Sequence, residues 1–145
     1  MKKTLWFALT ISAAVVYAAI ATISVVLGGC DSLLELTSGS EVPMKCQWAF
    51  QATAALGVAG VLLELFALTL KTSEGYRASA VTHVILGALI VAMPLGVIGT
   101  CASPEMACNT TKLFVCGLAG VVMALSIIQL IASSQTNQDK PKARL

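Results

Sequence analysis

The sequence predicts an all-α integral membrane protein, a bundle of four helices that cross the bilayer. Hydrophobic residues make up 57% of the 145 residues and charged residues only 11%, which is more apolar surface than a soluble domain of this length can bury. Four apolar runs each reach the roughly 20 helical residues that a hydrocarbon core of about 30 Å requires. Because these runs are continuously apolar and do not alternate, helices are expected and a β-barrel is not.

Short polar segments separate the four runs, so the chain is expected to form a single membrane domain. The predicted spans are residues 5–28, 48–70, 80–100 and 113–132. The segments outside them are the loops at 29–47, 71–79 and 101–112 and the polar tail at 133–145, which is expected to be disordered.

The basic residues are distributed unevenly over the two sides of these spans. Lys45 and Lys112 lie on one side, and the other seven of the nine basic residues lie on the side of the termini. Basic loops stay in the cytoplasm, so we expect both termini and the 71–79 loop to be cytoplasmic in a multi-pass protein of the cell membrane. The other two loops are then extracytoplasmic, where disulfides persist.

A pair of cysteines brackets each outward loop. Cys30 precedes Pro43-Met44-Lys45-Cys46, and Cys101 precedes Pro104-Glu105-Met106-Ala107-Cys108. Four outward cysteines allow three pairings. We expect one structural disulfide within each loop and place cross-links between the loops second. Leu27-Gly28-Gly29-Cys30 also has the form of a lipobox, but the apolar stretch before it exceeds the length of a signal peptide's hydrophobic region.

The two halves of the chain are also alike inside the spans. Gly57-Val58-Ala59-Gly60-Val61 in the second span corresponds to Gly117-Leu118-Ala119-Gly120-Val121 in the fourth. We interpret this likeness as two pseudo-repeated helical hairpins, related by an axis along the membrane normal. Since small residues let helices approach closely, these glycines are expected where the second and fourth helices meet.

Ionisable residues within membrane spans are functional candidates, because burying them in lipid is costly. Glu64 and His83 are such residues, and Gln129 is a third polar group. A rise of about 1.5 Å per residue places all three at a similar depth in the inner half of the bilayer. We expect them to form one intramembrane polar cluster, which either joins the helices by hydrogen bonds or acts as a proton-sensitive or partner-binding site.

Three functions fit these residues. The favoured one is a non-enzymatic accessory subunit, which contacts lipid and other membrane proteins. Such a subunit needs no cofactor and binds no nucleic acid, and it is compatible with a homo-oligomer. The first alternative is a thiol–disulfide oxidoreductase coupled to quinone, although the chain lacks the Cys-x-x-Cys spacing that tunes a thiolate. The second is a soft-metal or haem protein, because methionine and cysteine sulfurs suit copper(I). The candidate soft-metal ligands are Met44, Cys46, Met106 and Cys108.

The loop motifs also resemble those of a known family. Pro43-Met44-Lys45-Cys46 and Cys101-x-x-Pro104-x-Met106-x-Cys108, at the outer ends of four spans, are similar to motifs of an uncharacterised family of small four-helix bacterial membrane proteins. In that family the first motif reads Met-Lys-Cys-His, so this chain departs at Gln47, which weakens a metal or haem role for the first loop. The resemblance implies an association with an ABC transporter, which would make the accessory subunit part of such a complex.

Overall fold

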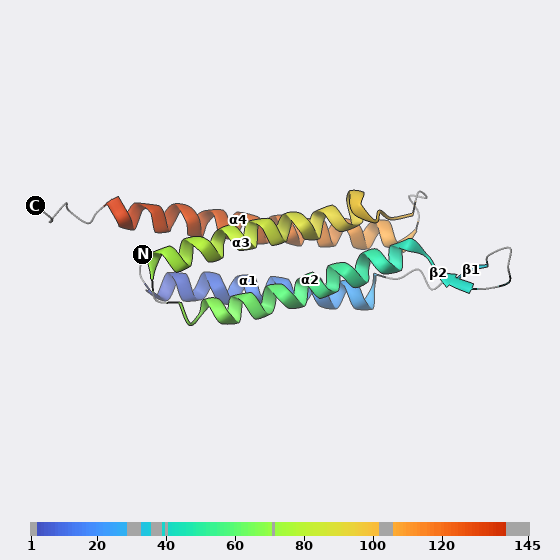
Figure 1. The fold of residues 1–145 in the computed structure, drawn as a ribbon, viewed down its shortest axis with the longest axis horizontal. Helices are drawn as coiled ribbons and strands as arrows, with labels where there is room; N and C mark the ends of the chain where they lie inside the picture. Colours follow the sequence, from blue (N-terminus) through green and yellow to red (C-terminus); the bar gives the residue numbers. More distant parts are fainter. Residues whose placement is uncertain are drawn as a thin grey trace, which may run out of the picture.

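The computed structural model describes residues 3–28, 33–35, 39, 41–70, 72–101 and 106–138. Four long helices run side by side as an antiparallel bundle (Figure 1). They are α1 (Lys3–Val26), α2 (Lys45–Ala67), α3 (Ser73–Ala92) and α4 (Ala107–Gln138). Each contains an apolar stretch long enough to cross a membrane. The predicted all-α four-helix bundle is therefore confirmed.

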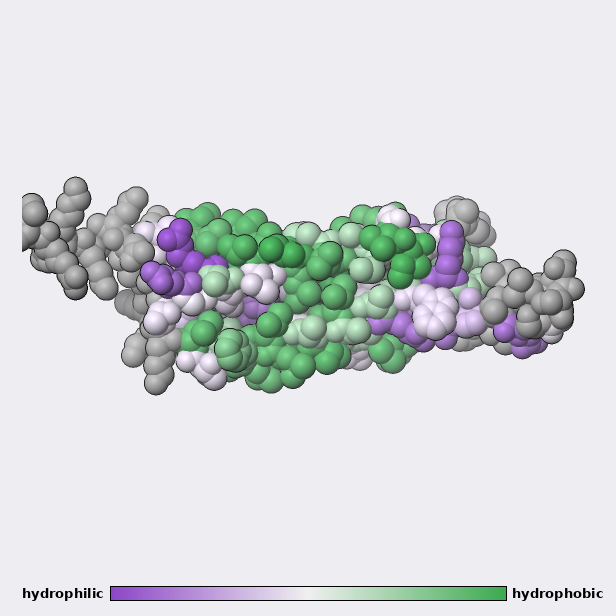
Figure 2. All heavy atoms as spheres, in the orientation of Figure 1, coloured by the Kyte–Doolittle hydropathy of each residue, from purple (hydrophilic) through white to green (hydrophobic). Residues whose placement is uncertain are grey.

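The surface of the bundle has the polarity expected of a membrane protein. Figure 2 shows apolar residues covering the middle of the visible face and polar residues gathered towards the two ends. Large apolar side chains are exposed on every long helix, for example Val15, Leu62, Ile85 and Ile128. A continuous apolar surface of this kind is unfavourable in water, so contact with lipid chains is its simplest explanation.

The helices pack as two hairpins. α1 packs mainly against α2 and α3 mainly against α4, while the contact between α1 and α4 joins the two pairs. The core contains Tyr17 and Ile20 from α1, Phe50 from α2, Ile90 from α3 and Val115 from α4. All four helices thus contribute to one core that extends along the bundle.

The matching glycines do not lie between the second and fourth helices, so that expectation is wrong. Gly57 and Gly60 face α1, and a Cβ atom added at Gly60 would lie 2.4 Å from the Tyr17 ring. A Cβ atom added at Gly117 or Gly120 would meet nothing within 4 Å. The physical reason is the hairpin pairing, since α2 turns its small residues towards its own hairpin partner.

α3 ends in a turn of π-helix, η1 (Met93–Val97), which follows from the proline within it. Pro94 has no N–H group and its ring crowds the preceding turn, which disturbs the α-helical bonding pattern. The amides of Ile98 and Gly99 both donate to the Met93 carbonyl, at 3.2 Å each. Gly99 then takes a positive φ of 81°, which glycine adopts without a steric cost. This turn leads the chain to Cys101.

Several predicted boundaries differ from those of the structure. α3 begins at Ser73, before the predicted residue 80, and α4 begins at Ala107, before the predicted residue 113. α2 begins at Lys45, before the predicted residue 48, which places Cys46 on its first turn. Within the predicted 29–47 loop, strands β1 (Leu33–Glu35) and β2 (Glu41–Pro43) pair antiparallel. α4 continues to Gln138, so predicted disorder is wrong for residues 133–138. The polar serines at this point are satisfied within the helix, because the Ser133 and Ser134 hydroxyls both donate to the Leu130 carbonyl.

Candidate functional site

Three cysteines meet at the end of the bundle that carries the β1–β2 hairpin. Cys46 lies on the first turn of α2 and Cys108 on the first turn of α4, while Cys101 lies in the segment between η1 and α4. Their Sγ atoms all lie within 4.8 Å of one another. Antiparallel packing brings these positions together, because α2 and α4 both begin at this end of the bundle (Figure 1).

The cysteine cluster, as we name Cys46, Cys101 and Cys108, is partly closed to solvent. Cys46 and Cys108 are fully buried members of the hydrophobic core, and Cys101 is half-buried at its edge. The Met44 side chain packs against the same core. The cluster therefore has an apolar inner side and one sulfur near the surface.

Polar side chains hold the segment that carries Cys101. The Asn109 side-chain amide donates to the Cys101 carbonyl at 3.3 Å, and the Thr100 hydroxyl donates to Asn109 Oδ1 at 3.2 Å. Lys112 Nζ donates to the Thr100 hydroxyl at 3.1 Å. These bonds tie the end of the η1 segment to the first turns of α4, so Cys101 is positioned by the helix that carries Cys108.

The protonation of Cys101 reflects this environment. Burial raises the pKa of the Cys101 thiol above its ordinary value of 9.0, and hydrogen bonds with Cys46 and Cys108 raise it further. The thiol therefore keeps its proton at neutral pH until something displaces it. A cysteine that attacks disulfides usually has a lowered pKa, so this shift argues against a nucleophilic role for Cys101.

The disulfide predicted within the second loop is not formed. Cys101, Cys108 and Cys116 are free thiols, so no bond joins Cys101 to Cys108. Cys30, the other half of the predicted first bond, lies outside the described residues. The prediction paired cysteines that are close in sequence. Helix packing instead places Cys46 beside both Cys101 and Cys108, so no single pair is selected. The disulfide expectation is corrected to a cluster of three thiols.

The predicted soft-metal ligands separate into two groups. Cys46 and Cys108 lie together, and Met44 packs against the core that contains them. The Met106 side chain is 38% exposed. Cys101 is the sulfur that sequence reasoning assigned only to a disulfide, although its place in the repeated pattern already marked it as the counterpart of Cys30.

A second polar site lies inside the bundle, between α1, α2 and α3. Glu64 and His83 are almost fully buried, and His83 Nε2 lies 3.4 Å from Glu64 Oε1. The Tyr17 hydroxyl lies 3.1 Å from the other ring nitrogen, His83 Nδ1, and 3.4 Å from the His83 carbonyl. Tyr17 is the residue that sequence reasoning missed, since a lone tyrosine in an apolar span carries no sign of a partner 66 positions away.

The buried pair, as we name Glu64 and His83, is incompletely satisfied. Within the described part of the chain Glu64 Oε1 has no hydrogen-bond partner, so the 3.4 Å between this atom and His83 Nε2 is a close contact without hydrogen-bond geometry. Gln129, which was expected in the same cluster, is also buried. Its Nε2 atom has no hydrogen-bond partner among the described residues, so no bond from that atom joins it to the pair.

Comparison with known protein families gives one match. The family described as Domain of unknown function (DUF4418) matches residues 9–133. The chain belongs to this family. The DUF4418 match includes the cysteine cluster and the buried pair, so both lie within the family's domain. No curated protein and no solved structure matches the chain. Membership of an uncharacterised family is thus confirmed, while the Met-Lys-Cys-His motif and a bacterial source stay predictions.

Proposed function

We propose that this protein binds a soft metal ion, copper(I), in a three-thiolate site formed by Cys46, Cys101 and Cys108. The observation that carries the proposal is the placement of all three Sγ atoms within 4.8 Å of one another. Metal–sulfur bonds of about 2.3 Å place the sulfurs around a shared ion roughly 4 Å apart. The three thiols therefore need to move together by less than about an ångström to enclose an ion.

The ligand types favour copper(I) over other common ions. The cluster found among the described residues contains sulfur alone, and soft thiolate and thioether ligands suit copper(I). Structural zinc sites usually have four ligands, and histidine is a frequent member. The single histidine of the chain, His83, belongs to the buried pair, so it does not supply an imidazole for zinc or haem at the cysteine cluster. Met44, which packs against the core that contains Cys46 and Cys108, is the candidate for a fourth, thioether ligand.

The surroundings also favour the negative charge of a metal–thiolate complex. Cys46 and Cys108 both lie on first helical turns, where the helix dipole stabilises anions. Lys45 is the neighbour of Cys46 in sequence, and Lys112 lies one turn after Cys108. Metal binding requires loss of the thiol protons, and at Cys101 the ion would have to displace the proton of a thiol whose pKa is raised.

The proposal fits the predicted orientation of the chain. If the cysteine cluster faces the extracytoplasmic side, its thiols are open to oxidation, and ligation to a metal would protect them. The alternative of a thiol–disulfide oxidoreductase fits less well, because the chain lacks the Cys-x-x-Cys spacing that tunes a thiolate for exchange. The accessory role beside an ABC transporter stays a prediction, and the proposed site does not depend on it.

A competition titration tests the proposal. The full chain, reduced and kept free of oxygen in lipid nanodiscs, is titrated with copper(I) against a chromogenic copper(I) chelator. We expect one copper ion per chain to be withheld from the chelator, and an excess of zinc to leave that ion in place, because thiolate sites bind copper ions more tightly than zinc. No retention of copper by the folded protein would contradict the proposal.

A further inference from the structure

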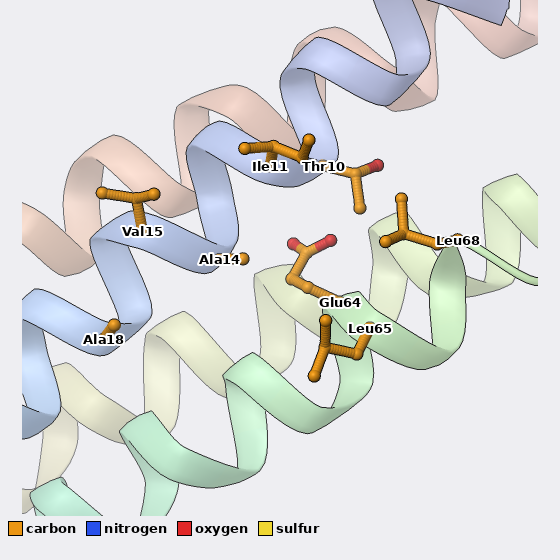
Figure 3. A pocket seen from close by; sticks show the side chains of 8 residues that line it. All are labelled: Thr10, Ile11, Ala14, Val15, Ala18, Glu64, Leu65 and Leu68. Atoms are coloured by element: carbon orange, nitrogen blue, oxygen red, sulfur yellow. The ribbon is translucent and has the colours of Figure 1, made fainter.

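A groove on the side of the bundle leads to Glu64 of the buried pair. It lies between α1 and α2 and has a volume of about 360 Å³. Its apolar walls are formed by Ile11, Ala14, Val15 and Ala18 of α1 and by Leu65 and Leu68 of α2 (Figure 3). Ile11, Val15 and Leu65 are among the exposed apolar side chains of the lipid-facing surface. The groove therefore opens to the hydrocarbon region and is within the size range of small-molecule sites.

The polar group in this groove is the Glu64 carboxyl. In Figure 3 it points from α2 towards α1, into the space between Ala14 and Thr10. Thr10 also lines the groove, but its hydroxyl already donates to the Trp6 carbonyl at 3.1 Å. Glu64 is 2% exposed, and its Oε1 atom has no hydrogen-bond partner within the described residues. An unsatisfied carboxyl in a membrane interior is costly, so a ligand that pairs with it gains a strong interaction.

We propose that the groove binds a lipophilic amine, with its apolar body along the walls and its ammonium group on the Glu64 carboxylate. The lining residues include no basic side chain, so the charge of the site is complementary to a cation. A neutral amine that enters from the lipid can take the proton of the Glu64 carboxyl, which forms an ammonium–carboxylate pair with no change in net charge. A charge-assisted hydrogen bond of this kind is roughly twice as strong as a neutral one.

Neighbouring residues define the geometry of this site. His83 Nε2 lies 3.4 Å from Glu64 Oε1 on the side of α3, and the Tyr17 hydroxyl holds the other end of the imidazole at 3.1 Å. The imidazole thus occupies the inner side of the carboxyl, which leaves the α1–α2 groove as the approach for a ligand. The site uses none of the cysteines, so it stands or fails separately from the proposed copper site.

Equilibrium binding of 4-phenylbutylamine tests the proposal, with 4-phenylbutan-1-ol as the neutral probe of the same shape. The full chain is reconstituted in nanodiscs of uncharged lipid, and binding is measured by scintillation proximity. We expect saturable binding of the amine and a loss of about tenfold or more in affinity for Glu64→Gln, which removes the charge at constant size. Ala14→Leu, which fills the groove, should have a similar effect, whereas Ala55→Leu on the exposed face of α2 should have none. Equal binding of amine and alcohol, or unchanged binding by Glu64→Gln, would overturn the proposal.

A second measurement uses the unaltered chain and so does not depend on the folding of a variant. Dicyclohexylcarbodiimide is an apolar reagent that modifies carboxyl groups within membranes, and peptide mass mapping locates the modified residue. We expect modification at Glu64, with protection that rises with the concentration of 4-phenylbutylamine and not with that of the alcohol. Failure of the amine to protect a modified Glu64 would overturn the proposal, as would an unmodified Glu64.

Discussion

The cysteine cluster and the buried pair differ in both construction and chemistry. The cluster lies at the end of the bundle and combines two helix starts with a non-helical segment. The buried pair lies within the helices, where the Tyr17 hydroxyl holds the His83 ring from α1. Sulfurs at the ends of helices can draw together around an ion, whereas a carboxyl inside a packed bundle keeps its position. The comparison shows why the first site suits a metal and the second a ligand from the lipid.

The chemistry of the ligand atoms also assigns a metal ion to the cysteine cluster and an organic ligand to Glu64. Three sulfurs prefer a soft ion, while a lone carboxyl beside an imidazole offers too few ligands for an ion of its own. The two sites also differ in access, because Cys101 is half-buried near the surface and Glu64 is reached through a groove in the apolar wall. Changes at one site should therefore leave the other intact.

The largest effect is expected from removing one sulfur of the cysteine cluster. Cys108→Ser should weaken copper(I) binding by more than about 100-fold, because changes in the groups that only orient metal ligands already cost 10- to 100-fold. The competition titration measures this change. Cys116→Ser is the matched control, since Cys116 lies further along α4 and outside the cluster. An equal loss of copper in both variants would contradict the assignment.

The second largest effect is expected on the free energy of unfolding, from a substitution in the packing beside the buried pair. Gly60→Ala places a methyl group against the fully buried Tyr17 ring, and overpacking of this kind costs about 1–3 kcal/mol. Gly120→Ala is the control from the matching position of α4, where the methyl group meets nothing within 4 Å. Unfolding in mixed micelles measures both variants. Equal destabilisation would contradict the different packing of the two repeats.

Acidification should weaken copper binding at the cysteine cluster. The raised pKa of Cys101 means that the proton competes with the metal throughout the neutral range. Affinity should therefore rise with pH by up to about tenfold per unit for each proton displaced, until the pH exceeds the thiol pKa. Titrations between about pH 6 and about pH 8 measure the slope. A flat profile would show that the ion does not replace a thiol proton.

The smallest effect is expected from removing a single hydroxyl. Tyr17→Phe leaves His83 Nδ1 without the 3.1 Å contact, and hydrogen bonds within membrane bundles contribute about 0.5–1 kcal/mol to stability. Copper binding should not change. Tyr76→Phe is the control, because its ring stacks on Trp6 with centroids 4.3 Å apart and that stacking needs no hydroxyl. Micelle unfolding should separate the two variants, and identical stabilities would argue against the Tyr17–His83 contact.

The sequence predicted the fold better than the pairing of side chains. Four apolar runs are sufficient to predict four helices, because the length and polarity of a span depend on local residues alone. The repeated cysteine pattern also indicated the right end of the bundle. The predicted pairing of cysteines was wrong because it depends on which helices touch. The starts of α2 and α4 bring Cys46 beside both Cys101 and Cys108.

The same limitation explains the glycines and Tyr17. Gly57 and Gly117 occur in nearly identical segments, yet only Gly57 lies against a neighbouring helix. The likeness of the segments therefore could not reveal the packing partner. Depth along the spans correctly placed Glu64 near His83. The third member of that site, Tyr17, comes from α1, where no periodic pattern of polar residues indicates a buried polar contact.

The most direct test of the copper site is X-ray absorption at the copper edge, on the reduced full chain loaded with one equivalent of copper(I) in nanodiscs. The account predicts a first shell of three sulfur atoms at about 2.3 Å, the usual length of a metal–thiolate bond. The same spectrum for Cys101→Ser should lose one sulfur from that shell. A first shell of nitrogen or oxygen atoms in the unaltered protein would contradict the central claim.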